Sequence, residues 1–251
     1  MALPVITVGS GPHHVLAVHG WFGSADGWGP FVNALNTDEF TYAFMDVRGY
    51  GARQAESGAH TMEEIAFDAL ALADQRGWES FSLVGHSMGG MAIQKIVAES
   101  SGRVQRIVGI TPVPATGVPF DEQSWGLFSG AAENDANRFA IIDFTTGSRL
   151  TSTWVNEMVE FSVANSTRAA FAAYLNAWAK SDFQSTLAGN PVPALAIVGE
   201  NDPAITADVM NMTWMAAFPN AELQVFPNAG HYPMFETPVA LASAVENFLR
   251  G

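Results

Sequence analysis

Short apolar runs rich in Val, Ile and Phe recur along the chain, and most end at glycine or at an acidic residue. Runs of this length that are apolar throughout are typical of parallel strands buried on both faces. The pattern predicts strands over residues 14–18, 41–45, 80–84, 104–110, 194–198 and 222–226.

Helical patterns lie between these runs, and residues 61–76 form the clearest one. Thr61 can cap this helix, and Glu64 would complete a Thr-x-x-Glu capping box. Residues 238–249 predict a closing helix with Pro238 in its first turn. Strands that alternate with helices indicate an α/β fold with a mainly parallel sheet.

The middle of the chain breaks this alternation. Residues 115–187 contain no strand-like run, and their aromatic residues fall at spacings that suit amphipathic helices. Prolines precede this stretch, and a Gly-Asn-Pro-Val-Pro segment at 189–193 follows it. We therefore expect one core made of residues 1–114 and 188–251, with a helical insertion at 115–187 lying over the sheet.

Charge and composition exclude several classes of function. The chain has 25 acidic and 11 basic side chains, a net charge of −14, so we expect neither nucleic acid nor an anionic membrane as a partner. It has no cysteine, which excludes disulfides, thiolate zinc sites and a cysteine nucleophile. No basic residue precedes Arg48 and no long apolar run occurs, so we expect a soluble, cytoplasmic protein.

A Gly-x-Ser-x-Gly motif surrounds Ser87, directly after one predicted strand and directly before a helical stretch at 91–100. At such a turn, strained backbone geometry exposes the serine hydroxyl above the sheet, and the flanking glycines allow neighbouring backbones to approach. The next helix directs its N-terminal N–H groups to the same place. A glycine-rich packing turn is the alternative, but this context favours Ser87 as a nucleophile.

A serine nucleophile needs a base and a carboxylate that orients the base. His231 lies in a loop after the last predicted strand and is the candidate base. The strand at 194–198 leads into a turn that contains Glu200 and Asp202. We select Asp202 as the orienting carboxylate and keep Glu200 as the competitor, since Glu200 is closer to the strand and suits the turn itself.

An oxyanion hole requires two backbone N–H donors, one of them from the residue after the nucleophile. That residue is Met88. The second donor should come from the glycine-containing loop after residues 14–18, where we assign Trp21, with Phe22 as the fallback. Both rings can also serve as core or pocket aromatics.

The chain as a whole resembles the α/β-hydrolase superfamily, in the branch of small serine esterases, lactonases and carbon–carbon bond hydrolases with a helical cap. The order Ser87, Asp202, His231 is the order of that superfamily. The matching motifs are His19-Gly20-Trp21, Asp46-Val47-Arg48-Gly49-Tyr50-Gly51, Gly85-His86-Ser87-Met88-Gly89-Gly90, Gly199-Glu200-Asn201-Asp202-Pro203 and Gly230-His231-Tyr232-Pro233.

The resemblance implies a sheet of about seven strands, because residues 5–8 correspond to the family's second strand and the usual first strand is absent or vestigial. It also implies that Asp46 and Arg48 brace the site without touching substrate, and that His19 and His86 are structural. Ser87 excludes epoxide hydrolases and haloalkane dehalogenases as functions, because those family members use aspartate at this position. His86 makes a carbon–carbon bond hydrolase a weaker candidate, because those enzymes usually have Asn at this position. Phe22 does the same for a perhydrolase, because such members favour Pro there.

The sequence therefore predicts a metal-free and cofactor-free hydrolase that cleaves uncharged carboxylic esters through an acyl-enzyme. Adjacent His13 and His14 would point to opposite faces of a strand, and no H-E-x-x-H motif occurs. We expect an apolar pocket that includes Phe22, Trp125, Phe144 and Trp154. A lactonase, a carbon–carbon bond hydrolase with the same triad, and a small-ligand receptor that keeps the fold remain alternatives.

Overall fold

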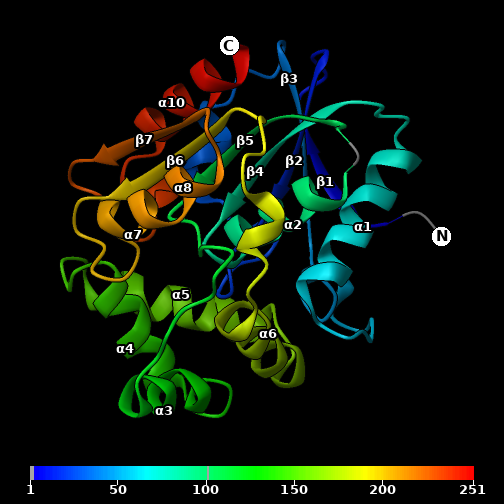
Figure 1. The fold of residues 1–251 in the computed structure, drawn as a ribbon. Coiled ribbons are helices and arrows are strands. Elements are labelled where there is room, and N and C mark those ends of the chain that lie inside the picture. Colours follow the sequence, from blue (N-terminus) through cyan, green and yellow to red (C-terminus); the bar gives the residue numbers. More distant parts are fainter. Residues whose placement is uncertain (1–2, 101) are drawn as a thin grey trace.

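A computed structural model describes residues 3–100 and 102–251, and residues 1, 2 and 101 of the expected core lie outside this part (Figure 1). Its centre is a seven-stranded sheet in the order β1-β3-β2-β4-β5-β6-β7. The strands are β1 (Val5–Val8), β2 (His13–Val18), β3 (Phe40–Met45), β4 (Phe81–His86), β5 (Val104–Ile110), β6 (Ala194–Gly199) and β7 (Ala221–Phe226).

All neighbouring strands are parallel except β1, which pairs antiparallel with β3. This confirms the predicted α/β class and the mainly parallel sheet. Every residue of β4 and of β6 is buried, which explains why β6 is apolar throughout and why Ser82 and His86 are the only polar residues of β4. β4 runs two residues further than the apolar pattern indicates, because Gly85 and His86 still pair with Gly109 and Ile110.

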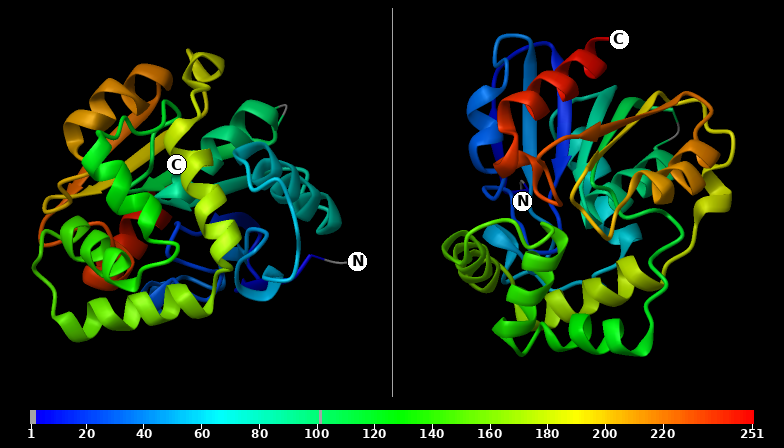
Figure 2. Two further views of the ribbon diagram at one scale, coloured as in Figure 1. Left: turned by 90° about the horizontal axis from the view of Figure 1, so that it is seen from below. Right: turned by 90° about the vertical axis from the view of Figure 1, so that its left-hand side faces the viewer.

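Helices cover both faces of the sheet (Figure 2). One face carries α1 (Met62–Gln75), α2 (Met88–Glu99), α7 (Ala207–Met212) and α8 (Trp214–Ala217). The other face carries the 3-10 helix η1 (Gly29–Ala34) and α10 (Pro238–Arg250), which pack on each other, and the short helix α9 (Pro233–Glu236) contacts both.

Only half of the predicted capping box forms at the start of α1. The Thr61 hydroxyl accepts a hydrogen bond from the Glu64 N–H (3.2 Å). The Glu64 carboxylate instead accepts from the N–H groups of Ala59 (2.9 Å) and His60 (3.0 Å). Glu64 thus holds the loop that precedes the helix.

Four helices and a 3-10 helix fill residues 115–187, where the structure contains no strand apart from a single bridge between Tyr50 and Ser166. They are α3 (Glu122–Gly130), α4 (Asp135–Thr145), α5 (Ser152–Ala164), α6 (Arg168–Lys180) and η3 (Gln184–Leu187). In each of the four α-helices a side chain at the N-cap accepts a backbone hydrogen bond. Figure 1 shows that α3 to α6 lie together beyond one end of the strands. We call residues 115–187 the helical insertion.

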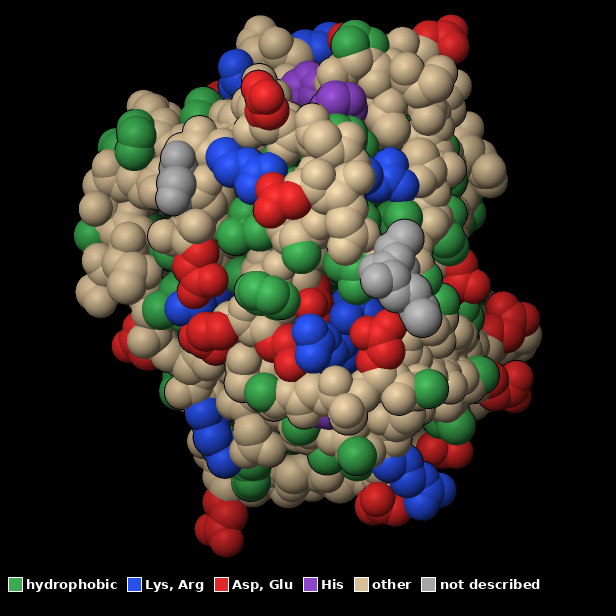
Figure 3. All heavy atoms as spheres, turned by 90° about the vertical axis from the view of Figure 1, so that its right-hand side faces the viewer, with side chains coloured by type: hydrophobic (Ala, Val, Ile, Leu, Met, Phe, Trp, Pro, Cys, Tyr) green, Lys and Arg blue, Asp and Glu red, His purple; other side chains and the backbone are tan. Residues whose placement is uncertain are grey.

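Surface charge is mixed despite the acidic composition. On the face drawn in Figure 3, acidic side chains lie beside Lys and Arg side chains in several places, and hydrophobic side chains form small separate groups. Within residues 3–100 and 102–251, no helix is long and apolar enough to cross a membrane.

Candidate active site

Ser87 occupies a sharp turn between β4 and α2. Its φ of 52° is rare for a residue with a side chain, and the strain is held by the packed elements on both sides. A Cβ atom on Gly85 would lie 2.3 Å from the carbonyl oxygen of Gly89, and one on Gly89 would lie 2.0 Å from that of Val18. Only glycine permits this crossing of backbones, so the motif has the geometry of a nucleophile elbow.

His231 and Asp202 meet in the way expected of a base and its orienting acid. His231 Nδ1 lies 2.6 Å from Asp202 Oδ2, and the Asp202 side chain is fully buried. The other carboxylate oxygen accepts hydrogen bonds from the N–H groups of Ala204 (2.9 Å) and Ile205 (3.2 Å). Glu200, the competing candidate, is exposed, whereas Asp202 contacts the histidine.

The backbone of His231 is held from two sides. Its N–H donates to the carbonyl oxygen of Thr145 at the end of α4 (3.1 Å). Its own carbonyl oxygen lies 2.9 Å from His86 Nε2, which must therefore carry a proton and donate. Burial, followed by the nearby His231, lowers the pKa of His86 to about 3, so His86 stays neutral near pH 7. His86 is thus a support for the candidate base.

Trp21 and Phe22 lie at the centre of a turn that the Gly23 N–H closes by donating to the Gly20 carbonyl (3.0 Å). Trp21 is fixed firmly: its Nε1 donates to the Phe171 carbonyl (2.8 Å), and its own carbonyl accepts from the Tyr50 hydroxyl (3.0 Å). Met88 is the first residue of α2, so its N–H has no partner within the helix. Both residues that would supply the oxyanion donors are thus buried.

Several of the candidate site residues line one cavity. It measures about 600 Å³ including its solvent-open mouth, and its wall is mostly apolar. Ser87 and His231 line it together with Trp21 and Phe22. The other lining residues come mainly from the helical insertion and from loops beside the elbow: His86, Val113, Val118, Phe120, Phe128, Ile141, Thr145, Trp178, Ala204, Ile205 and Tyr232.

Three of the four predicted pocket residues lie elsewhere. Phe22 lines the cavity, but the Phe144 side chain points outward and is 51% exposed. Trp154 packs edge-on against Tyr232 (5.5 Å between ring centroids), and the Trp125 ring lies under Lys180 Nζ (4.0 Å). Aromatic spacing located the helices of the insertion but not the face that each turns to the cavity.

The cavity residues of α4 follow a helical period that the sequence does carry. Ile141 and Thr145 are four residues apart and share one face, while Phe144 is rotated by about 100° from Thr145 and lies at the solvent side of that face. Phe120, Phe128 and Trp178 supply the aromatic wall that was expected from other residues.

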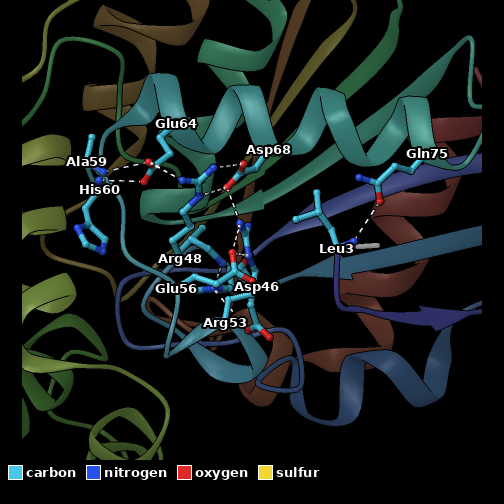
Figure 4. A network of polar contacts seen from close by, with 12 residues as sticks. Leu3, Asp46, Arg48, Arg53, Glu56, Ala59, His60, Glu64, Asp68 and Gln75 are labelled. Atoms are coloured by element: carbon cyan, nitrogen blue, oxygen red, sulfur yellow. Dashed lines mark hydrogen bonds and ion pairs between the residues drawn. The ribbon is translucent and has the colours of Figure 1, made fainter. Parts of the chain in front are cut away.

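Asp46 and Arg48 lie outside the cavity wall, and they have different partners (Figure 4). Arg48 binds both carboxylate oxygens of Asp68 (2.9 and 2.8 Å) on α1. Asp46 accepts from the N–H groups of Ala25 (2.7 Å) and Ala52 (2.9 Å), which joins the loops after β2 and β3. Both residues brace the loops beneath the site.

His19 is also internal. Its Nδ1 lies 2.8 Å from the Gly20 carbonyl oxygen and therefore carries the proton, which leaves Nε2 to accept from the Val47 N–H (3.3 Å). Among the described residues, no three His, Asp or Glu side chains gather in a way that could hold a metal ion.

Comparisons with known proteins show which family the chain resembles. The model of the alpha/beta hydrolase family matches residues 15–244. Esterase YbfF of Escherichia coli is 25% identical over 94% of this chain and 92% of its own length. A non-heme haloperoxidase of Rhodococcus erythropolis is 26% identical over 85% of this chain and 83% of its own.

Solved structures give the same fold. An esterase from Exiguobacterium antarcticum superposes with a TM-score of 0.88 at 17% identity, covering 98% of this chain and 95% of that one. The family model spans most of the chain, including both parts of the core and the whole helical insertion. The chain therefore belongs to the alpha/beta hydrolase family.

Proposed function

We propose that the protein is a serine hydrolase that cleaves uncharged, apolar carboxylic esters through an acyl-enzyme intermediate. The observation that carries the proposal is the 2.6 Å contact between His231 Nδ1 and Asp202 Oδ2, which lies behind the wall of the apolar cavity that His231 and Ser87 line. Esterases among its relatives are consistent with this reaction class.

In the first half-reaction, Ser87 Oγ attacks the ester carbonyl carbon and its proton passes to His231 Nε2. Asp202 accepts the Nδ1–H of His231, keeps the tautomer in which Nε2 is a base, and stabilises the imidazolium that forms. The N–H groups of Trp21 and Met88 donate to the oxyanion. The bond to the alkoxy oxygen then breaks, and the leaving alcohol takes the proton from His231.

In the second half-reaction, a water molecule gives a proton to His231 and attacks the acyl carbon bound to Ser87. The same two N–H groups stabilise the second oxyanion. Its collapse releases the carboxylic acid, and the proton on His231 returns to Ser87 Oγ. No co-reactant other than water is needed.

The cavity wall supports an apolar, neutral substrate. Each buried methylene gains roughly 0.8 kcal/mol, whereas a charged group would lose hydration without a counter-charge in the wall. The net charge of −14 also opposes anionic substrates. We propose that the helical insertion acts as a cap, because Phe120, Phe128 and Trp178 form much of this wall.

The test is steady-state hydrolysis of p-nitrophenyl esters of increasing acyl length, alongside lactones, by wild type and Ser87→Ala. We expect many turnovers by wild type and a loss in kcat on the order of 10⁴ in the variant. Ser243→Ala, the control, removes an exposed hydroxyl on α10 and should keep the wild-type kcat. A single stoichiometric burst by wild type, with strong thermal stabilisation by ligand, would contradict the proposal and indicate a receptor.

A further inference from the structure

The loop that carries His231 is tied to a buried carboxylate outside the cavity wall. The Glu236 side chain is only 2% exposed. Its Oε2 accepts a hydrogen bond from the Gly230 N–H (2.8 Å), and its Oε1 accepts one from the Tyr232 N–H (3.1 Å). The two donors are the residues immediately before and after His231, so one side chain brackets the candidate base.

Arg149 completes this arrangement from the helical insertion, where it lies between α4 and α5. Its Nη1 donates to Glu236 Oε2 (2.8 Å), and its Nη2 donates to the carbonyl oxygen of Asn228 (2.9 Å), at the start of the same loop. Asn228 has a φ of 61°, a left-handed conformation that such a restraint helps to hold. Nη1 also lies 3.3 Å from the Thr146 carbonyl oxygen.

A carboxylate this well buried costs free energy unless each oxygen has donors. Glu236 has three, and charge-assisted bonds of this kind are the stronger ones. Two helices anchor this loop. Glu236 belongs to α9, and the Thr145 carbonyl oxygen at the end of α4 accepts from the His231 N–H. The backbone on both sides of His231 is thus held by residues from the helical insertion and from α9, while Asp202 contacts the imidazole itself.

We propose that Glu236 and Arg149 are positioning residues for His231, so that the helical insertion holds the general base as well as covering the pocket. The inference rests on the proposed function of His231. Neither residue lines the cavity, so substrate binding should not depend on them directly. Their loss should therefore lower kcat and leave KM nearly unchanged.

The kinetic test uses Glu236→Gln, Arg149→Met and the double variant. We expect Glu236→Gln to lower kcat by roughly 10- to 100-fold with KM within about threefold, because small displacements of a catalytic group cost rate steeply. Arg149→Met should act in the same direction and less strongly. The double variant should be no worse than Glu236→Gln, since the two residues act as a unit.

The matched controls are Glu133→Gln and Arg168→Met. These residues form another Arg–Glu pair at 2.8 Å, in which both side chains are about 70% exposed. We expect wild-type kcat and KM from both. A role in folding stability alone would lower the melting temperature of Glu236→Gln while its kcat at low temperature stays at the wild-type value.

A second readout does not require turnover. The proton between His231 Nδ1 and Asp202 should give a downfield NMR resonance that is absent in His231→Ala. We expect it to shift or broaden in Glu236→Gln and Arg149→Met, and to remain in place in both controls. If wild type hydrolyses no ester, the proposed function fails, and this resonance still reports whether the pair positions His231.

Two results would overturn the inference: kcat within about twofold of wild type in folded Glu236→Gln, or an unmoved proton resonance in that variant. Should Glu236→Gln fail to fold, Arg149→Met decides the matter. Its side chain is 31% exposed, so removal leaves no deep cavity. Wild-type kcat together with an unmoved resonance in Arg149→Met would then reject the proposal.

Discussion

Asp202 directs both carboxylate oxygens to named donors. Oδ2 faces His231 Nδ1, and Oδ1 accepts from the N–H groups of Ala204 and Ile205. Because the side chain is fully buried, water cannot replace a lost partner. Glu200, two residues earlier, faces solvent and has no such constraint.

Asp202→Asn should therefore lower kcat on the order of 10⁴-fold, since an amide N–H facing Nδ1 selects the tautomer that cannot accept the Ser87 proton. Glu200→Gln should stay within about twofold of wild type, as surface changes usually do. Hydrolysis of p-nitrophenyl butyrate by both variants measures the difference. A larger loss in Glu200→Gln would mean that the acid is misassigned.

His86 makes stability depend on acid. Its pKa is about 3 in the folded protein, lowered chiefly by burial, and about 6.5 in an unfolded chain. Between these values the unfolded state binds a proton that the folded state does not, so stability falls as pH decreases from about 6.5 towards 3. Burial also lowers the pKa values of His13, His14 and His19, which adds to the same trend.

Urea unfolding between pH 4 and 8 checks this. His86→Asn can still donate to the His231 carbonyl but has no titrating ring, so its stability should decline less steeply below about pH 6.5. If the free energy of unfolding falls equally with pH in wild type and in the variant, His86 does not contribute to the acid sensitivity of the fold.

At the scale of elements, the turn from β4 to α2 depends on the close approach of β2. The end of β2 passes so near to Gly89 that no side chain fits there. The same strand leads into the turn that carries Trp21, so this close approach sets the distance between Ser87 and the proposed oxyanion donor Trp21.

Gly89→Ala should destabilise the fold by roughly 1–3 kcal/mol or more, because its Cβ would lie 2.0 Å from the backbone oxygen of Val18. Gly126→Ala is the control, as nothing lies within 4 Å of its Cβ position in α3. That change should be neutral or add up to about 1 kcal/mol of helix stability. Thermal and urea unfolding compare the two, and equal stabilities would contradict the packing argument.

At the scale of the whole molecule, the proposed function implies that substrate selection depends on where the helical insertion meets the core. Phe128 of α3 lines the cavity and stacks near Trp21 (6.0 Å between centroids). Phe144 of α4 belongs to the same insertion and faces outward. The two phenylalanines therefore separate a pocket effect from a general effect of the insertion.

Phe128→Ala should shift the acyl-length preference towards longer chains, by about fourfold in kcat/KM per methylene accommodated, as expected from roughly 0.8 kcal/mol each. Phe144→Ala should keep the wild-type profile. The measurement is kcat/KM across a p-nitrophenyl ester series, including a carboxylate-bearing analogue at low and high salt. Identical acyl-length profiles in both variants, or a preference for the anionic analogue, would contradict the proposal that the helical insertion selects neutral, apolar substrates.

The linear sequence determined features that depend on neighbours along the chain. Apolar runs located six of the seven strands within two residues at each end, and the family resemblance located β1. Gly-x-Ser-x-Gly located the turn at Ser87, because this signal and the apolar runs are local. Their positions after the last two predicted strands indicated Asp202 and His231, which the fold brings into contact. Their catalytic roles remain predictions.

Tertiary structure alone decided which side chains face the cavity and which groups hold the histidine loop. Periodicity states that a helix is amphipathic, but its rotation is set by packing, so Phe144 faces solvent while Ile141 faces the cavity. Arg149 and Glu236 are 87 positions apart, and no local pattern links them. Such contacts form only when the insertion docks on the core, because burial then requires that each charge find its partner.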